Sequence, residues 1–443
     1  MILKKFLKKT NFTSFDRSIS ITTMHQKPDR YRTLEDKSIT FQIPRGAGLS
    51  YVPASFGKNI LVKELLLFNR ILDFDESSKI VIVESGITLK KLLEWSFEKH
   101  LFFPVLPGWP EITVGGCLAA NVHGKNPRKD GIFMDHVEWI ELFNPTFGTK
   151  IISRSNERKV FEATCGGLGL TGIITKVALR LQTLHSDSLL ITPKKAETLT
   201  DALNIMKQNT DHDVLYSWHI GSTFLNFGKG IVRLGTFSKK FNSDHLVVPK
   251  IKNMNSDNKL PPFSLWNNFS SSIINSINRK LEFSKGEIKK SLFSGLFPFV
   301  DRANIFYTLY GSKGFNEYQL LIDNNHAHEF LDDLIKLIKL DNPSLTFLFM
   351  KLFENSQKYL HFSGNGVSII LNLKHCDATL TFLKKLDDLI ISYNALPYII
   401  KDSRLSKRVV EQCYPEYFDF KDILKEIDPQ RIFKSELSER LDL

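Results

Sequence analysis

The spacing of apolar residues changes within residues 79–103, and the change predicts three successive elements. A continuous apolar run at the start of this segment predicts a buried strand. From Thr88 onward, Leu89, Leu92 and Leu93 recur at helical spacing, which predicts an amphipathic helix. A second apolar run closes the segment. We therefore expect a strand, a helix and a further apolar segment in this order.

Similar changes of pattern predict the other elements of the first 185 residues. We expect a strand that runs into a glycine-rich turn, a loop rich in proline and glycine, two strands joined by a turn, and a short helix followed by a glycine loop and a long strand. These segments are, in that order, residues 37–51, 104–116, 136–153 and 157–184.

Beyond residue 186 strand-like runs alternate with helical ones, and no internal repeat is visible. Residues 241–264 are polar and rich in proline and asparagine, which predicts a mobile loop. The predicted strands cover residues 189–193, 214–221 and 231–237, and the predicted helices cover residues 196–208, 265–281, 327–340 and 379–394.

The stretch TVGGCLAANVHGKNPRKDG, residues 113–131, has an order of residues that favours neither a regular helix nor a strand. Gly115, Gly116 and Gly124 lie between small and apolar residues, with His123 and Lys125 beside the last glycine. Glycine allows another group to approach the backbone closely. We therefore expect a ligand to lie against this segment.

A second glycine-rich stretch, residues 167–172, matches the spacing G-x-G-x-x-G. The dinucleotide-binding fingerprint needs a strand before the glycines and a helix after them, because the pyrophosphate lies on the helix N-terminus. Here the predicted helix comes first and the strand follows. The sequence therefore excludes a Rossmann site at this position.

Three glycine loops thus adjoin strands within the first 175 residues: PRGAGLSY, TVGGCLAANVHGKN and GGLGLTGII. Loops without side chains can bring backbone N–H groups to a phosphate without steric cost. One such loop would indicate only a turn. Three of them, in a mixed pattern of helices and strands, favour a large phosphorylated cofactor.

The length of 443 residues suits two domains, with one able to interrupt the other. The net charge of +11 favours an anionic partner, although a general basic bias explains it equally well. No dense basic run interleaved with aromatic residues occurs, so nucleic acid is the weakest choice. The four cysteines are isolated in sequence, which argues against zinc or a disulfide framework and favours a reducing compartment.

The N-terminal segment MILKKFLKKTNF alternates apolar residues with lysines. No apolar run follows, so a signal peptide is not expected, and no window has the length of a membrane span. As a helix, Leu3, Phe6 and Leu7 would share a face while the lysines met anionic headgroups. A frayed basic terminus is the equally favoured alternative.

The three glycine loops resemble those of the FAD-binding domain in the vanillyl-alcohol-oxidase (PCMH-type) flavoprotein superfamily. PGWPEITVGGCLAANVHGKN followed by CGGLGLTGII resembles one branch more closely, the decaprenylphosphoryl-β-D-ribose 2′-oxidases. YGSKGFNEYQL, KDSR, DPQRIF and the ending SELSERLDL resemble further segments of that branch in the same order. The resemblance spans nearly the whole chain and is weakest over residues 186–300.

The resemblance implies an α+β, two-domain PCMH-type fold in which a substrate domain built on an antiparallel sheet is inserted into the FAD-binding domain. It places the FAD-binding domain at residues 1–185, the substrate-binding domain at residues 186–395 and the C-terminal return to the FAD domain at residues 396–443. It also implies bound FAD. In related aldonolactone oxidases a histidine of the pyrophosphate loop bonds to the flavin, and Leu49 stands at the matching position here. We therefore expect non-covalent FAD.

The resemblance further implies which residues contact the cofactor. The amides of Gly115 and Gly116 should touch it, and His123 should pack near the reactive edge of the flavin. The implied cofactor-binding residues are Arg45, Gly46, Ala47, Gly48, Leu49, Ser50, Tyr51, Pro107, Gly108, Thr113, Gly115, Gly116, Ala119, Asn121, His123, Gly124, Asn126, Gly131, Gly167, Gly169, Gly172, Ile173, Tyr398 and Lys401.

Lys401, Tyr51 and His123 are the implied catalytic residues, with Lys401 stabilising the negative charge of reduced flavin and sharing in the transfer of the hydroxyl proton. The implied substrate-binding residues are Lys351, Gln319, Glu317, Ser368 and Asn365. A lysine on an apolar strand favours an anionic partner, or else extends to solvent.

This chain departs from the branch at three of these positions. Ser368 stands where the branch has cysteine, Asn365 where it has tryptophan, and Glu317 where glutamine is common. These changes affect the part of the site that holds the sugar, so they bear on which substrate is oxidised.

The resulting hypothesis is an FAD oxidoreductase that oxidises C2 of a polyprenyl-phosphate-linked pentose to a ketone, the first half of an epimerisation in cell-envelope glycan synthesis. A short-chain reductase would be its partner. The enzyme would be cytoplasmic, either free or bound peripherally to the inner face of the membrane, with no metal and no nucleic acid. The alternatives are an aldonolactone oxidase of the arabinono- or gulonolactone type, and a flavin-binding or scaffold protein without catalysis.

Overall fold

The computed structural model describes residues 7–35, 41–239, 248, 260–298, 300 and 307–443. The first sheet has the strand order β1-β2-β4-β3, in which β1 and β2 are antiparallel while β4 runs parallel to both β2 and β3. Its strands are β1 (Leu7–Thr13), β2 (Ser20–Gln26), β3 (Gln42–Arg45) and β4 (Leu61–Glu64).

The second sheet is antiparallel and has the order β5-β6-β10-β8-β9. The predicted strand pair at residues 136–153 is confirmed as β8 and β9, and the predicted helix after Thr88 as α2, whose first turn is capped by the Thr88 side chain. The elements are β5 (Ile71–Asp75), β6 (Ile80–Glu84), α2 (Leu89–Glu98), β8 (Val137–Asn144), β9 (Gly148–Ser153) and β10 (Ile173–Arg180).

The prediction that no regular helix forms in residues 113–131 is wrong. Val114–Ala119 forms the helix α3, and the Thr113 side chain accepts a hydrogen bond from the Gly116 N–H at its start. This N-cap stabilises a helix that the glycine pair disfavours on its own. The predicted order of helix, glycine loop and strand in residues 157–184 is confirmed, since α5 (Arg158–Thr164) precedes β10.

The third sheet is antiparallel throughout and has the order β15-β12-β14-β13-β17-β18-β16-β19. Its strands are β12 (Ser188–Ala196), β13 (Val214–Ile220), β14 (Gly230–Phe237), β15 (Ile288–Ser291), β16 (Phe315–Asp323), β17 (Leu345–Glu354), β18 (Asn365–Lys374) and β19 (Leu396–Pro397). The four predicted helices of this part are confirmed as α6 (Leu199–Gln208), α7 (Asn268–Ser284), α10 (Ala327–Asp341) and α11 (Asp377–Ser392).

Short elements connect the sheets. A two-stranded sheet joins β7 to β11 next to the second sheet. The short elements are β7 (Leu101–Phe102), β11 (Gln182–Thr183), α1 (Tyr31–Leu34), α4 (Pro127–Asp130), η2 (Phe133–His136), α8 (Leu292–Leu296), α12 (Lys407–Cys413), α13 (Tyr417–Ile427) and α14 (Glu436–Arg440).

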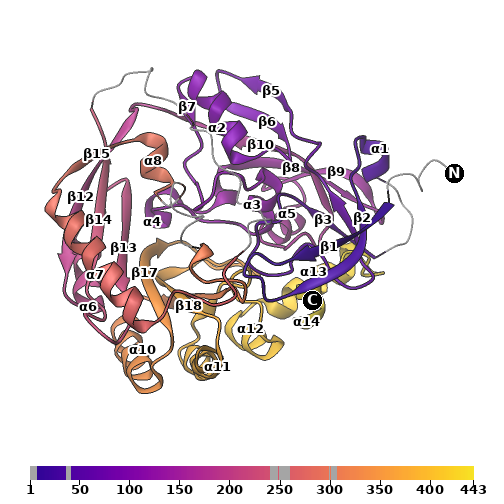
Figure 1. The fold of residues 1–443 in the computed structure, drawn as a ribbon. Coiled ribbons are helices and arrows are strands. Elements are labelled where there is room, and N and C mark those ends of the chain that lie inside the picture. The colour runs from indigo at the N-terminus through magenta and orange to yellow at the C-terminus, as the bar shows by residue number, and fades with distance from the viewer. Residues whose placement is uncertain (1–6, 36–40, 240–247, 249–259, 299, 301–306) are drawn as a thin grey trace.

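The end of the chain returns to the first sheet, and Figure 1 shows the yellow C-terminal helices beside β1–β3. The Gln42 N–H donates to the Ile432 carbonyl at 2.9 Å, and the Lys434 N–H donates to the Gln42 carbonyl at 3.1 Å. The turn before this pairing is held by buried Asp428, whose carboxylate accepts from the Ile432 and Phe433 N–H groups at 3.0 and 2.9 Å. The last residues therefore depend on the first sheet for their hydrogen bonds.

The expectation of mixed helices and strands with an antiparallel sheet after residue 186 is confirmed. The helix considered for the N-terminus is wrong at Leu7, which begins β1, and residues 1–6 lie outside the described part of the chain. Of the predicted loop at 241–264, only residues 248 and 260–264 are described. Within the described ranges, none of the helices has the length and apolar character that crossing a membrane requires.

Replacing Asp428 with alanine should lower the free energy of unfolding by about 2–3 kcal/mol, because two buried backbone N–H groups lose a charged acceptor. Urea unfolding of the purified protein measures this change. The matched control is Asp422→Ala, whose side chain is 70% exposed and should change stability by less than about 0.5 kcal/mol. Equal stability of the two variants would contradict the role given to Asp428.

Candidate functional site

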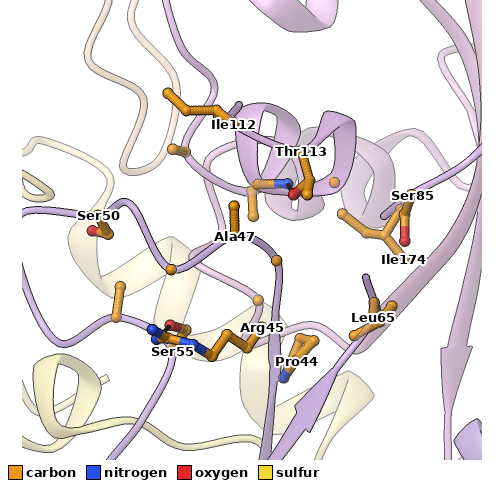
Figure 2. A pocket seen from close by; sticks show the side chains of 18 of the residues that line it. Pro44, Arg45, Ala47, Ser50, Ser55, Leu65, Ser85, Ile112, Thr113 and Ile174 are labelled. Atoms are coloured by element: carbon orange, nitrogen blue, oxygen red, sulfur yellow. Dashed lines mark hydrogen bonds between the residues drawn. The ribbon is translucent and has the colours of Figure 1, made fainter. Parts of the chain in front are cut away.

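The three glycine loops predicted from the sequence meet around one cavity of about 150 Å³ (Figure 2). One wall comes from the turn after β3, another from the start of α3, and the third from the loop between α5 and β10. Figure 2 shows Thr113, at the start of α3, facing Ala47 of the first loop. The glycines therefore gather backbone from three distant parts of the chain.

Two glycines of the first loop are required by its geometry. A Cβ atom on Gly46 would lie 2.1 Å from the Thr113 Oγ1 atom, so only glycine lets this loop touch the start of α3. Gly48 has a φ of +69°, in the left-handed region that side chains disfavour.

The first loop carries hydrogen-bonding groups without partners. Within the described part of the chain, no hydrogen bond takes up the backbone N–H groups of Ala47, Gly48, Leu49 or Ser50. The Ser50 Oγ atom is buried and likewise has no partner there. Buried polar groups are normally paired, so Ser50 Oγ fits a polar ligand in the cavity, and the free N–H groups of the same loop lie beside it.

Arg45 brings a cation to the same loop. Its guanidinium lies over the Phe12 ring at 4.7 Å and donates to the Ser55 Oγ atom at 2.7 Å. Burial lowers the Arg45 pKa to about 10, and nearby Glu64 partly offsets this effect. A half-buried cation next to unpaired N–H groups is suited to the pyrophosphate of a dinucleotide.

The amides of Gly115 and Gly116, predicted to touch the cofactor, already have hydrogen-bond partners within the protein. The Gly115 N–H donates to the Ser85 carbonyl at 2.7 Å, and the Gly116 N–H donates to Thr113 Oγ1 at 3.2 Å. Both residues still line the cavity. A Cβ atom would crowd Ser85 if placed on Gly115 and Thr113 if placed on Gly116, so side chains are disfavoured at both positions.

A second cavity of about 280 Å³ adjoins the first, and the two share Leu49, Ser50, Ile112, Val122 and Ile400. Its remaining wall comes from the third sheet and the segments around it. The lining residues with polar side chains, apart from Ser50, are Tyr51, His123, Lys125, Tyr216, Tyr307, Glu317, Gln319, Lys351, Asn372, Tyr398 and Lys401; Trp109 also lines it.

Three ammonium groups and one carboxylate line this second cavity. Burial lowers the pKa of Lys125 to about 8, with further lowering from Arg233 and Lys401. Burial, Lys125 and Lys401 hold the pKa of Lys351 well below its usual value. Glu317 supplies the only carboxylate among the described lining residues, so positive charge is in excess.

Lys401 is fixed by two contacts. Its Nζ atom lies 2.6 Å from Glu317 Oε1 and 3.8 Å from the centre of the Tyr51 ring. Asn372 donates to the other oxygen of Glu317 at 2.8 Å, and burial holds the pKa of Tyr51 well above its usual value. The cation therefore faces the cavity in a defined place.

His123 is neutral, because burial and the nearby Lys351 hold its pKa well below the usual value. The Gln319 amide nitrogen donates to Ser368 Oγ at 3.0 Å and lies 2.9 Å from His123 Nε2, which therefore accepts. The ring proton then lies on Nδ1, which is 3.2 Å from the Gly124 carbonyl. Lys351 donates to that same carbonyl at 3.0 Å.

Most of the residues predicted for the site line one of the two cavities, but eight do not. Ser368 is buried and reaches the site only through Gln319, and Asn126 donates to the His212 carbonyl at 2.7 Å. The remaining six residues line neither cavity. The eight residues are Asn121, Gly124, Asn126, Gly131, Gly167, Ile173, Ser368 and Asn365.

The placement of Asn365 in the substrate pocket is wrong. Alternate residues of a strand face opposite sides, so Ser368, Ile370 and Asn372 of β18 share one face while Asn365 lies on the other. Asn365 is exposed and accepts a hydrogen bond from Asn324 at 2.8 Å.

Sequence reasoning missed several residues of the second cavity. The alternation that excludes Asn365 would have found Ile370 and Asn372 on β18, and Phe347 and Phe349, four and two residues before Lys351, on β17. Lys125 directly follows Gly124 in the second glycine loop, but the sequence predicted no role for it. Tyr216 lies in the predicted strand 214–221, but the pattern did not show that its face meets the cavity, and Tyr307 comes from a segment for which no element was predicted.

Comparisons with known proteins agree with this geometry. A protein-family model described as an FAD binding domain matches residues 30–149, which include the first loop and α3. The decaprenylphosphoryl-β-D-ribose oxidase of Mycolicibacterium smegmatis is 24% identical over 422 residues, which is 90% of this chain and 89% of that protein.

Two further relatives are similar to different extents. L-gulonolactone oxidase 2 of Arabidopsis thaliana is 22% identical over 424 residues, 84% of this chain and 71% of that protein. D-lactate dehydrogenase of Anaerostipes hadrus is 30% identical over 145 residues, 31% of this chain and 30% of that protein.

The expectations of FAD and of an oxidoreductase are thereby confirmed. The chain carries a PCMH-type FAD-binding domain over residues 30–149 and is an FAD-dependent oxidoreductase of the class that acts on CH–OH donors.

Proposed function

We propose that FAD binds non-covalently across the two adjoining cavities. Arg45, the unpaired N–H groups of residues 47–50 and Ser50 Oγ would hold the pyrophosphate, and the second cavity would take the reactive ring together with the substrate. Leu49 lines both cavities and has no atom that could bond to a flavin, which supports a dissociable cofactor.

The substrate we propose is a sugar with an anionic group, most specifically a polyprenyl-phosphate-linked pentose oxidised at C2. One observation carries this choice: Lys125, Lys351 and Lys401 line the cavity, and among the described lining residues only Glu317 carries a carboxylate. A buried ammonium group without a counterion is costly, and a phosphate on the substrate would supply that counterion. The name of the Mycolicibacterium relative, a decaprenylphosphoryl-ribose oxidase, supports the same choice.

Bound FAD supplies the acceptor for the hydride that leaves the carbinol carbon. The Lys401 ammonium would stabilise the negative charge that develops, and Tyr51 holds that ammonium in place through its ring. The proton of the substrate hydroxyl would pass to the Glu317 carboxylate, 2.6 Å from Lys401 Nζ. Neutral His123, fixed by Gln319, would shape the cavity without adding a further charge. The product would be a ketone, which a short-chain reductase could reduce.

The other candidate is oxidation of a soluble aldonolactone, and the similarity to L-gulonolactone oxidases favours it. A lactone carries no phosphate, so it would leave Lys125 and Lys351 without a counterion. Anaerobic bleaching of the flavin with each substrate class separates the two. Bleaching by lactones alone would reject the lipid-linked sugar.

Replacing Ser50 with alanine should weaken FAD binding by roughly tenfold without lowering the stability of the apoprotein, because the hydroxyl has no partner within the described chain. Fluorescence titration of the apoprotein with FAD and urea unfolding measure the two effects. Ser155→Ala is the matched control on the exposed surface. Unchanged FAD affinity would show that Ser50 does not contact the cofactor.

Replacing Lys401 with methionine should slow reduction of bound FAD by substrate about 100- to 1,000-fold, because a preorganised cation is removed. FAD content should stay unchanged, and stopped-flow absorbance under anaerobic conditions measures the rate. Lys425→Met, at a lysine that is 67% exposed, serves as the control. An unaltered rate in Lys401→Met would refute the electrostatic role.

Affinity for a phosphorylated substrate should fall as the pH rises through about 8. The pKa of Lys125 is lowered to about 8, so its ammonium loses the proton above that pH and no longer pairs with phosphate. Titrations from pH 6 to pH 10 measure the dissociation constant. Lys125→Arg should move the fall to higher pH, since arginine stays protonated. A curve of the same shape in both proteins would assign the pH dependence to another group.

A further inference from the structure

The helix α7 presents its faces in the opposite sense to an ordinary surface helix. The buried side is polar: Ser271, Ser272 and Asn275 are fully buried, and Asn275 donates to the Thr346 carbonyl at 2.9 Å. Arg279 on the same side donates to the Gly230 carbonyl at 3.1 Å. A surface helix normally buries its apolar side and turns its polar side to water.

The apolar side of α7 faces solvent instead. Its five large apolar side chains on one arc of the helix are 36% to 57% exposed: Phe269, Ile273, Ile274, Ile277 and Leu281. Two exposed residues of the loop before β14 extend the same patch, since the Phe224 ring lies 5.3 Å from the Phe269 ring and the Leu225 carbonyl accepts from Ser272. We call these seven residues the α7 surface.

Contiguous apolar patches of this kind mark sites that another molecule covers. The polar side of α7 is fixed to the third sheet by hydrogen bonds, so the helix cannot rotate to bury the patch. In Figure 1 α7 lies across β12, β13 and β14 at the outer edge of the molecule. The patch therefore points outward on a rigid support.

Lysines border the α7 surface. Lys280 and Lys285 are exposed and form no ion pair within the described chain, while Glu287, three residues after the helix, is an exposed acidic residue. Lys195 lies with its Nζ atom 4.0 Å from the centre of the Phe283 ring at the same end of the helix. Arg279 and Arg233 are instead paired with Glu197 and Glu282. Because the lysines outnumber Glu287, the net unpaired charge beside the patch is positive.

We propose that the α7 surface docks on a membrane of anionic phospholipids. An apolar arc with a basic border is the pattern of a helix that lies in the membrane interface, with apolar side chains among the acyl chains and lysines at the headgroups. A second copy of the chain is disfavoured, because a symmetric contact through this patch would bring the lysines of one copy against those of the other.

The docking surface lies on the same face of the third sheet as the second cavity. Tyr216 lines the cavity, and two residues later Trp218 on β13 donates to Glu282 of α7 at 3.2 Å. Trp266, just before α7, lies with its ring 6.3 Å from that of Phe347, which also lines the cavity. If the proposed function is correct, docking would bring the site beside the lipid that carries its substrate.

Co-sedimentation with vesicles tests the proposal. The full-length protein should bind vesicles of equal parts phosphatidylcholine and phosphatidylglycerol, bind phosphatidylcholine vesicles more weakly, and lose the difference at high salt. The combined substitutions Ile273→Ser, Ile277→Ser and Leu281→Ser should lower the partition coefficient by about tenfold or more. Lys280→Glu with Lys285→Glu should lower it on anionic vesicles only.

A matched control removes three exposed aliphatic residues elsewhere, by Leu67→Ser, Ile151→Ser and Leu340→Ser, and should bind as the unchanged protein does. FAD content reports correct folding of every variant. Unchanged binding of the α7 variants would overturn the proposal. So would a loss confined to Lys4→Glu with Lys5→Glu at the N-terminus, or a dimer in sedimentation velocity that the α7 substitutions dissociate.

Vesicle binding and catalysis can fail separately. The α7 variants should oxidise a short-chain phosphorylated substrate analogue at the same rate as the unchanged protein, because the substituted residues do not line the cavity. A protein that binds vesicles through α7 but oxidises no phosphorylated sugar would refute the proposed function and leave the docking surface in place.

Discussion

The site depends on the close contact between the loop after β3 and the start of α3. A side chain on Gly46 would collide with Thr113, and Thr113 must keep its position because its hydroxyl caps α3. The contact holds the loop in a form whose N–H groups have no partner in the described chain. A binding surface for an anion thus arises from glycines without side chains and from unpaired N–H donors, beside the half-buried Arg45 at the start of that loop.

The third sheet lines its cavity with side chains, whereas the loop after β3 lines the first cavity mainly with backbone. Its strands place charged and aromatic side chains at alternate positions, so Phe347, Phe349 and Lys351 reach the cavity from one face of β17. Burying several ammonium groups together costs free energy, which the lowered pKa of Lys125 reflects. Proteins retain such an arrangement where a ligand compensates for it, and this connects the electrostatics of the cavity with the class of substrate that we propose.

The helix α7, whose polar side is buried and whose apolar side is exposed, leaves groups without a partner at the surface of the protein. Asn275 bonds to the sheet at the Thr346 carbonyl, Ser272 bonds to the Leu225 carbonyl in the loop before β14, and the isoleucines stay exposed to water. Hydrogen bonds fix the orientation that the hydrophobic effect alone would reverse. Cofactor loops, cavity and α7 therefore each contain groups that the described chain leaves unsatisfied, and each points to a different ligand.

The sequence by itself determined the order of helices and strands, the three glycine loops and the resemblance to FAD-linked oxidases, because these follow from local periodicity and from motifs. Predictions from the sequence were wrong where contacts between residues far apart in the chain determine the local structure. The Thr113 cap, together with the packing of the first turn of α3 against Ser85 and the Gly46 loop, makes residues 114–119 a helix. The pleat of β18 turns Asn365 away from the cavity and turns Asn372 toward it. The pairing of Lys401 with Glu317, 84 positions earlier in the chain, and the outward face of α7 were decided only by tertiary structure, since burial depends on which elements pack together.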